Sequence, residues 1–90
     1  IAVYAAGVNF RDVLNALGML QPYLEQIGFK DASDIPFGGE CAGKIVAVGE
    51  TVKGLQIGDE VIAAFALGSL ASFVTVKSSF VVPKPQELSF

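Results

Sequence analysis

The chain has 90 residues with 52% hydrophobic content, one cysteine, no histidine and a net charge of −3. This length allows one small domain with a modest core, and the negative charge argues against nucleic acid as a partner. The single cysteine and the lack of histidine exclude a disulfide framework and the usual zinc clusters, and they favour a reducing, cytoplasmic setting. No apolar run approaches the roughly 20 residues that span a bilayer, so no membrane segment is expected.

The aliphatic content is high for a free-standing domain of this length, which indicates that part of the surface faces another part of the polypeptide or a partner. The sequence has no methionine start, no cationic leader and no polar C-terminal tail. We therefore expect a piece of a longer protein.

Residues 1–8 are almost wholly apolar and small, which predicts a strand buried on both faces. An amide, a cation and an anion follow at Asn9, Arg11 and Asp12, and apolar residues then recur at helical spacing until Gly18. Polar groups crowded beside a buried strand need hydrogen-bond partners. This turn is therefore either a structural network of hydrogen bonds or part of a functional site. The rest of the chain is expected to serve as its scaffold.

The next part of the chain predicts a second short helix and a loop. Residues 19–30 place Pro22 near the first helical position and Gly28 at the C-terminal end, with apolar residues between them. Residues 31–36 are polar, and Pro36 biases the residue before it towards an extended conformation. Helical structure is thus expected only in the first third of the chain.

Short strands separated by glycine turns dominate the remaining two thirds. The strands are expected at residues 45–48, 60–65, 70–76 and 80–82, and prolines close the last one. Four or five such strands indicate a mainly β domain, a small antiparallel barrel or sandwich. The sequence contains no Gly-x-Gly-x-x-Gly and no Gly-x-x-x-x-Gly-Lys-Ser/Thr, so no nucleotide-phosphate loop is expected in these residues.

Two segments resemble the medium-chain dehydrogenase/reductases. Residues 38–52 reproduce the spacing of their signature strand and turn, Gly-x-Glu-x-x-Gly-x5-Gly-x-x-Val, and residues 58–61 look like their Gly-Asp-x-Val turn. In the zinc alcohol dehydrogenases of this superfamily, a histidine and a cysteine ligate zinc at the positions of Gly39 and Asn9, and Cys41 occupies neither position. One thiol without an imidazole does not make a catalytic zinc site. We therefore predict an enzyme without a catalytic metal.

A narrower resemblance is carried by residues 5–18, Ala-Ala-Gly-Val-Asn-Phe-Arg-Asp-Val-Leu-Asn-Ala-Leu-Gly, together with Gly-Gly-Glu-Cys-Ala-Gly at 38–43. These segments look like those of the enoyl reductase domains of modular polyketide synthases, and the resemblance runs through essentially the whole chain. It implies that residues 1–90 are part of a GroES-like catalytic domain. That domain would pack against a Rossmann domain, outside this sequence, that holds NADPH. The isolated chain is then expected to be inactive.

Enoyl reductases of this family act on an α,β-unsaturated acyl thioester carried by an acyl carrier protein. Hydride passes from the nicotinamide to the β-carbon, and a proton then reaches the α-carbon. The cofactor supplies the hydride chemistry, so the protein supplies orientation and electrostatics. The resemblance thus implies NADPH, a carrier-tethered thioester and the other domains of a polyketide synthase as partners. A homodimer is one assembly that the sequence leaves open.

The resemblance also assigns roles to residues around the first turn. Asn9 and Phe10 would form the wall under the nicotinamide ring, with the Asn9 amide hydrogen-bonded to the cofactor or to the thioester carbonyl. Alternatively, Asn9 caps the helix that follows. Arg11, Asp12 and Glu40 are expected to organise the scaffold near the cleft rather than to act as acids or bases.

Leu20 is the main departure from the family pattern. Many polyketide enoyl reductases have a tyrosine at this position, assigned as the proton donor to the α-carbon. Leucine cannot donate, although Leu20 is still expected to contact the substrate. The donor is then a group of the cofactor domain or water, with Tyr23 a weaker candidate, or else the stereochemical outcome differs. The lost tyrosine is also compatible with enoyl reductase variants that close a cyclopropane by expelling a halide.

Two further functions remain as alternatives. A free-standing quinone or enone reductase would share the fold and the hydride transfer but not the carrier protein. A non-catalytic GroES-type module would use its apolar surface for assembly. Its mobile loop should be polar and glycine-rich, whereas residues 9–18 carry a cluster of polar residues followed by a predicted helix. The Asn-Phe-Arg-Asp-Val-Leu stretch favours the enoyl reductase.

Overall fold

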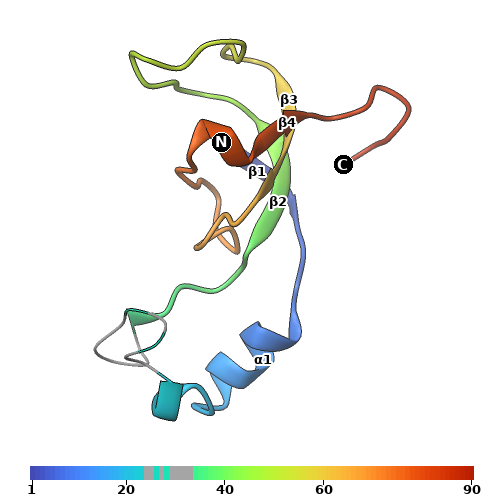
Figure 1. The fold of residues 1–90 in the computed structure, drawn as a ribbon. Helices are drawn as coiled ribbons and strands as arrows, with labels where there is room; N and C mark the ends of the chain where they lie inside the picture. Colours follow the sequence, from blue (N-terminus) through green and yellow to red (C-terminus); the bar gives the residue numbers. More distant parts are fainter. Residues whose placement is uncertain (24–25, 27, 29–33) are drawn as a thin grey trace.

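A computed structural model describes residues 1–23, 26, 28 and 34–90. Its centre is a four-stranded antiparallel sheet in the order β1–β2–β3–β4. The strands are β1 Ala2–Ala6, β2 Glu40–Lys44, β3 Glu60–Ala64 and β4 Val81–Pro83. Figure 1 also shows helix α1, Phe10–Ala16, and the chain further contains the short 3-10 turns Gln21–Tyr23 and Ser78–Phe80. The predicted mainly β architecture with its α-helix in the first third is confirmed.

The sheet buries a small apolar core. Cys41 on β2 and Ala63 on β3 are 4% and 0% exposed, and they pack with Ala66 and Val74. Burial raises the pKa of the Cys41 thiol, so this side chain is a protonated, small hydrophobic group at neutral pH. In the described part of the chain, no helix is long and apolar enough to cross a membrane.

Helix α1 lies at one end of the molecule, away from the strands (Figure 1). Residues 7–9 lead from β1 into the helix, and residues 35–39 lead back into β2. Asn9 has an extended backbone, φ −112° and ψ 160°, and precedes the first helical residue. Gly18 has φ +73°, a left-handed conformation that favours glycine and ends helices. The predicted stop at Gly18 is therefore confirmed.

The first strand differs from the prediction. It was expected to be buried on both faces, but Tyr4 is 57% exposed. The pairing of β1 with β2 shifts between Val3 and Ala5, so Tyr4 has no partner in the register. An extra residue of this kind bends the strand and turns its side chain outward. The expectation of burial on both faces was wrong for this reason.

The prediction of a strand at residues 45–48 is also wrong, because the residues that pair with the neighbouring strands are 40–44. β2 runs through the glycine-rich residues 40–44 and pairs with β1 on one side and β3 on the other. A Cβ on Gly43 would overlap the carbonyl oxygen of Ala2, so glycine permits this close approach. After Ile45, whose N–H donates to the Asp59 carbonyl at 3.0 Å, the chain leaves the sheet.

The predicted strand at residues 70–76 is reduced to a single bridge between Phe73 and Ala2. The N–H of Leu70 donates to the carbonyl of Phe37 instead, at 3.3 Å, so this part of the segment is held by a loop rather than by a strand. The strands predicted at 60–65 and 80–82 are confirmed to within one residue at each end as β3 and β4.

The helix predicted over residues 19–30 appears in the structure as the turn Gln21–Tyr23, with Pro22 in its middle. Most of the rest of that predicted helix, including Leu24 and Ile27, lies outside the described residues, as do residues 31–33 of the predicted loop.

Candidate functional site

The site is built where the N-terminus of α1 meets the segment that enters β2. The link between them is the carboxylate of Asp12, which is 4% exposed. Its Oδ1 accepts the N–H of Gly38 at 2.8 Å and its Oδ2 accepts the N–H of Asn9 at 3.0 Å. One buried side chain therefore fixes both the start of the helix and a loop 26 positions away.

These hydrogen bonds control the charge of Asp12. The bonds from Asn9 and then Gly38 lower the pKa of the carboxyl, burial partly opposes this, and the Arg11 guanidinium lowers it further. A carboxylate that accepts backbone N–H bonds is stabilised in its charged form. Asp12 is therefore ionised at neutral pH.

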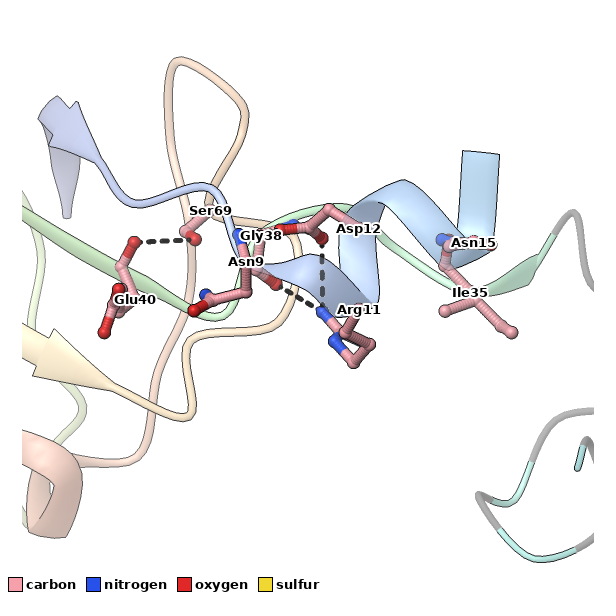
Figure 2. A network of polar contacts seen from close by, with 8 residues as sticks. All are labelled: Asn9, Arg11, Asp12, Asn15, Ile35, Gly38, Glu40 and Ser69. Carbon is pink, nitrogen blue, oxygen red and sulfur yellow. Dashed lines mark hydrogen bonds and ion pairs between the residues drawn. The ribbon is translucent and has the colours of Figure 1, made fainter. Parts of the chain in front are cut away.

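Two more side chains bind α1 to the same segment (Figure 2). The Arg11 guanidinium donates to the Gly38 carbonyl at 2.9 Å and lies 3.6 Å from the Asp12 carboxylate. The amide of Asn15 is buried and donates to the Ile35 carbonyl at 3.0 Å. Gly38 thus has its N–H and its carbonyl bound by adjacent residues of the helix, which holds its φ at +89°.

The buried face of α1 is consequently its polar face. Asp12 and Asn15 are the buried residues of the helix, whereas Phe10 is 73% exposed and Leu17 is 68% exposed. A helix on a globular surface usually shows the reverse pattern, with apolar residues towards the core. The buried contacts of this helix are therefore hydrogen bonds of polar side chains, and the side chains of Phe10 and Leu17 are largely exposed.

The side chain of Asn9 is exposed. Asn9 and Asp12 have the arrangement of a capping box, but the N–H of Asp12 donates to the Asn9 backbone carbonyl at 2.9 Å, and the Asn9 side chain makes no cap hydrogen bond. In Figure 2 it points away from the body of α1, on the side of Glu40. A Cβ on Gly39 would lie 3.9 Å from Asn9 Nδ2. The two positions at which zinc relatives carry ligands are therefore neighbours here.

Glu40 opens β2 beside this amide. Its backbone carbonyl accepts the N–H of Gly7 at 3.2 Å and the hydroxyl of Ser69 at 3.1 Å. Its side chain lies against Gly7, where a Cβ would overlap the carboxylate. Gly7 thus leaves the room that Glu40 occupies.

Leu20 is not brought to the same place. It lies beyond the C-terminal end of α1, whereas Asn9 directly precedes the N-terminal end. The seven residues of the helix separate them by roughly 10 Å along its axis. A separate apolar pocket of about 480 Å³ lies between residues 45–55 and 73–81, and none of the predicted site residues lines it.

No group of three His, Cys, Asp or Glu side chains that would hold a metal ion is found in residues 1–23, 26, 28 and 34–90. Position 9 offers an amide and position 39 offers no side chain at all. These donors do not fit a catalytic zinc ion, which needs three protein ligands of nitrogen, sulfur or carboxylate type.

Sequence reasoning missed two residues of the network. Ser69 is 0% exposed and holds the carbonyl of Glu40, but a serine in a Gly-Ser turn gives no signal of this contact. Asn15 does give one, because it lies three positions after Asp12 and so on the same helix face. Two polar residues at that spacing indicate a shared polar face, but such a face usually points to solvent, so its burial could not be predicted from the sequence.

The fold and this geometry agree with known proteins. Residues 1–86 match the alcohol dehydrogenase GroES-like domain. The chain belongs to this family. The GroES-like domain described here is 37% identical, over 99% of the chain, to a phenolphthiocerol/phthiocerol polyketide synthase of Mycobacterium tuberculosis. It is 39% identical over 100% of the chain to the spectinabilin polyketide synthase system protein NorB of Streptomyces orinoci. It spans only 4% of the length of each of these relatives.

Solved structures place the GroES-like domain among enoyl reductases. The CurK enoyl reductase is 52% identical over 100% of the chain, with a TM-score of 0.92. The JamJ enoyl reductase is 40% identical over 98% of the chain, with a TM-score of 0.90. In both cases the chain spans 27% of the solved protein. The resemblance to polyketide enoyl reductases that the sequence indicated is confirmed.

Proposed function

We propose that this chain is part of an NADPH-dependent enoyl reductase that reduces an α,β-unsaturated acyl thioester on an acyl carrier protein during polyketide synthesis. The observation that carries the proposal is the 52% identity and the TM-score of 0.92 to the CurK enoyl reductase over the whole chain. The curated relatives, named as polyketide synthases, support the biosynthetic context.

The residues around Asn9 fit one end of NADPH. The Asn9 amide can both donate and accept, and Phe10 presents a ring that is 73% exposed beside it. A mycobacterial relative, 29% identical and with a TM-score of 0.77, was solved in complex with NADPH, which supports the choice of cofactor. When bound, NADPH supplies a hydride to the β-carbon of the substrate. Asn9 would orient the carboxamide of the nicotinamide or the carbonyl of the thioester. Phe10 would cover the nicotinamide ring and exclude water.

The buried ion Asp12 takes no direct part in this chemistry. Both of its oxygens accept backbone N–H groups, so its role in the proposal is to hold Asn9 and Gly39 at a fixed separation. Arg11 supports the same loop through Gly38. Leu20 would contact the acyl chain and cannot donate a proton, so the α-carbon proton comes from the cofactor domain or from water.

In this proposal the nucleotide-binding Rossmann domain lies outside residues 1–90. The 90-residue chain alone should show no saturable NADPH binding, and micromolar binding by it would contradict this division of labour. A cytoplasmic location and assembly with other synthase domains belong to the same proposal.

The test is turnover by the full-length enzyme. Incubation with a crotonyl or longer enoyl thioester on a carrier protein and NADPH should yield a product heavier by two hydrogens in mass analysis. Turnover of quinones but not of thioesters would instead support a free-standing quinone reductase. Loss of halide with ring closure on a halogenated substrate would support the cyclopropane-forming variant. This outcome is worth testing because the CurF cyclopropanase is 40% identical to the chain, with a TM-score of 0.81.

A further inference from the structure

Residues 84–90, which we call the C-terminal strap, follow β4 and turn back towards the sheet (Figure 1). Pro83 and Pro85 flank the first residue of the strap and restrict the backbone there. The N–H of Leu88 donates to the carbonyl of Pro85 at 3.1 Å and closes a turn. The strap therefore follows a defined path.

Lys84 holds the first end of the strap. Its side chain is 6% exposed, and its ammonium group lies 3.3 Å from the Glu60 carboxylate. The same ammonium donates to the carbonyls of Pro85, at 3.3 Å, and Leu88. A buried lysine is stable only when its charge is paired and its three N–H groups find acceptors, and these three partners meet that need. One side chain thus joins β3 to the turn of the strap.

Phe90 holds the far end of the strap. Its ring stacks on the ring of Tyr4 in β1, with centroids 4.6 Å apart and an interplanar angle of 30°. Lys44 Nζ lies 5.4 Å from the centroid of the Tyr4 ring, and Lys84 Nζ lies 5.2 Å from that of the Phe90 ring, within the range of cation–π attraction. Since β1 and β4 are the two edges of the sheet, the strap connects one edge to the other.

The irregularity in β1 makes this contact possible. Tyr4 is the residue left out of the pairing between β1 and β2, and bulges of this kind redirect a side chain. The exposed Tyr4 ring is therefore the surface on which Phe90 packs. The bulge and the buried lysine are separate features of the sheet, and both hold the same seven-residue segment.

We propose that Tyr4 and Lys84 are positioning residues, which hold the strap on the sheet and so fix where the polypeptide that leads to the cofactor domain departs. This inference rests on the proposed function, in which NADPH is bound mainly outside residues 1–90. Residues 87–90 lie beyond the range that matches the GroES-like domain, which supports a connecting role for the strap. The separation of Asn9 from the nicotinamide then depends on the strap, and a small misplacement of the reacting groups slows hydride transfer.

Hydrogen–deuterium exchange and steady-state kinetics on the full-length enzyme test this role. Tyr4→Ala should raise the exchange rate of the N–H groups of residues 86–90 by roughly 3- to 10-fold, the worth of one aromatic pair. It should lower kcat by roughly 3-fold or more and leave KM for NADPH unchanged, because the strap holds the domains and not the nucleotide. Tyr4→Phe keeps the ring and should match the wild type. Lys84→Met removes three polar contacts and should change exchange and kcat more than Tyr4→Ala does.

Phe73→Ala is the matched control, because Phe73 is 65% exposed but lines the separate apolar pocket. It should change neither the exchange of the strap nor the kinetics. Unchanged exchange in Tyr4→Ala would overturn the proposal, as would faster exchange with unchanged kcat in both Tyr4→Ala and Lys84→Met, or a rise in KM for NADPH as large as the fall in kcat. A wild-type enzyme without thioester turnover would overturn the proposed function and this role with it, whereas normal wild-type turnover with unaffected variants would overturn the role of the strap alone.

Discussion

The carboxylate of Asp12 accepts the N–H of Gly38 at 2.8 Å and thereby joins helix α1 to the segment that enters β2. The helix makes few apolar contacts with the sheet, so this bond, together with those of Arg11 and Asn15, determines where the helix lies. The position of Asn9 follows from that of the helix. Stability and function should therefore be linked through Asp12.

Asp12→Ala should lower the free energy of unfolding by about 3 kcal/mol, because it removes two bonds to a charged acceptor and leaves the buried N–H of Gly38 without a partner. Asp12→Asn keeps one acceptor oxygen and should cost about half as much. Urea denaturation of the enzyme measures both. Glu50→Gln is the control, since Glu50 is exposed, and it should change stability by less than about 0.5 kcal/mol. Equal stability of the Ala variant and the control would contradict the structural role.

Stability should fall at acid pH because of the same group. The folded-state pKa of Asp12 is lowered, first by the Asn9 N–H and then by the Gly38 N–H. The unfolded chain therefore binds the proton more tightly than the folded one, and the contribution of Asp12 is fully present above the ordinary carboxyl pKa, about 4. It is lost as the pH falls from there through the lowered folded-state value.

The measurement is the melting temperature of wild type and Asp12→Asn between about pH 2 and pH 7. The difference between the two should be constant above about pH 5 and should shrink below about pH 4. A difference that grows towards low pH would mean that the folded-state pKa is raised rather than lowered.

Gly38→Ala should be strongly destabilising. Its φ is +89°, and an added Cβ would lie 2.6 Å from the backbone nitrogen of Leu70. We expect a loss above about 3 kcal/mol, from the left-handed backbone and from the forced shift of a buried loop. Gly54→Ala is the matched control, since Gly54 has φ +82° but open space around it. It should cost only about 1–2 kcal/mol. Similar losses at the two positions would show that the contact with Leu70 is unimportant.

Asn9→Ala should lower kcat by roughly 10- to 100-fold, which is the effect of losing one hydrogen bond in the transition state. Its melting temperature should change little, because the Asn9 side chain makes no cap hydrogen bond. Asn15→Ala should do the opposite, since the buried amide of Asn15 holds the Ile35 carbonyl and is not directed at a ligand. Steady-state kinetics and thermal unfolding on both variants give the comparison. A lower melting temperature with unchanged kcat for Asn9→Ala would assign Asn9 to capping.

Much of the fold followed from local patterns in the sequence. The helix ends at Gly18 because glycine adopts φ +73° without steric cost, and this could be predicted from the chain alone. The start of β2 could not be, because the local pattern places the strand at the β-branched residues 45–48 and not at the glycine-rich residues before them. Gly43 forms part of a strand because the carbonyl of Ala2 approaches it closely, which is a contact between distant segments.

The candidate site divides in the same way. The sequence by itself determined which groups are present: an amide at Asn9, a cation at Arg11, an anion at Asp12, and no side chain to act as a ligand at Gly39. Residue identity is enough for these conclusions, because the chemistry of a side chain does not depend on the fold. Only the tertiary structure decided that Asp12 is buried, that the amide of Asn9 faces Gly39, and that Tyr4 turns its ring outward. Each of these depends on hydrogen bonds between segments far apart in the chain. A local sequence pattern does not show which distant groups will meet, so it cannot predict these bonds.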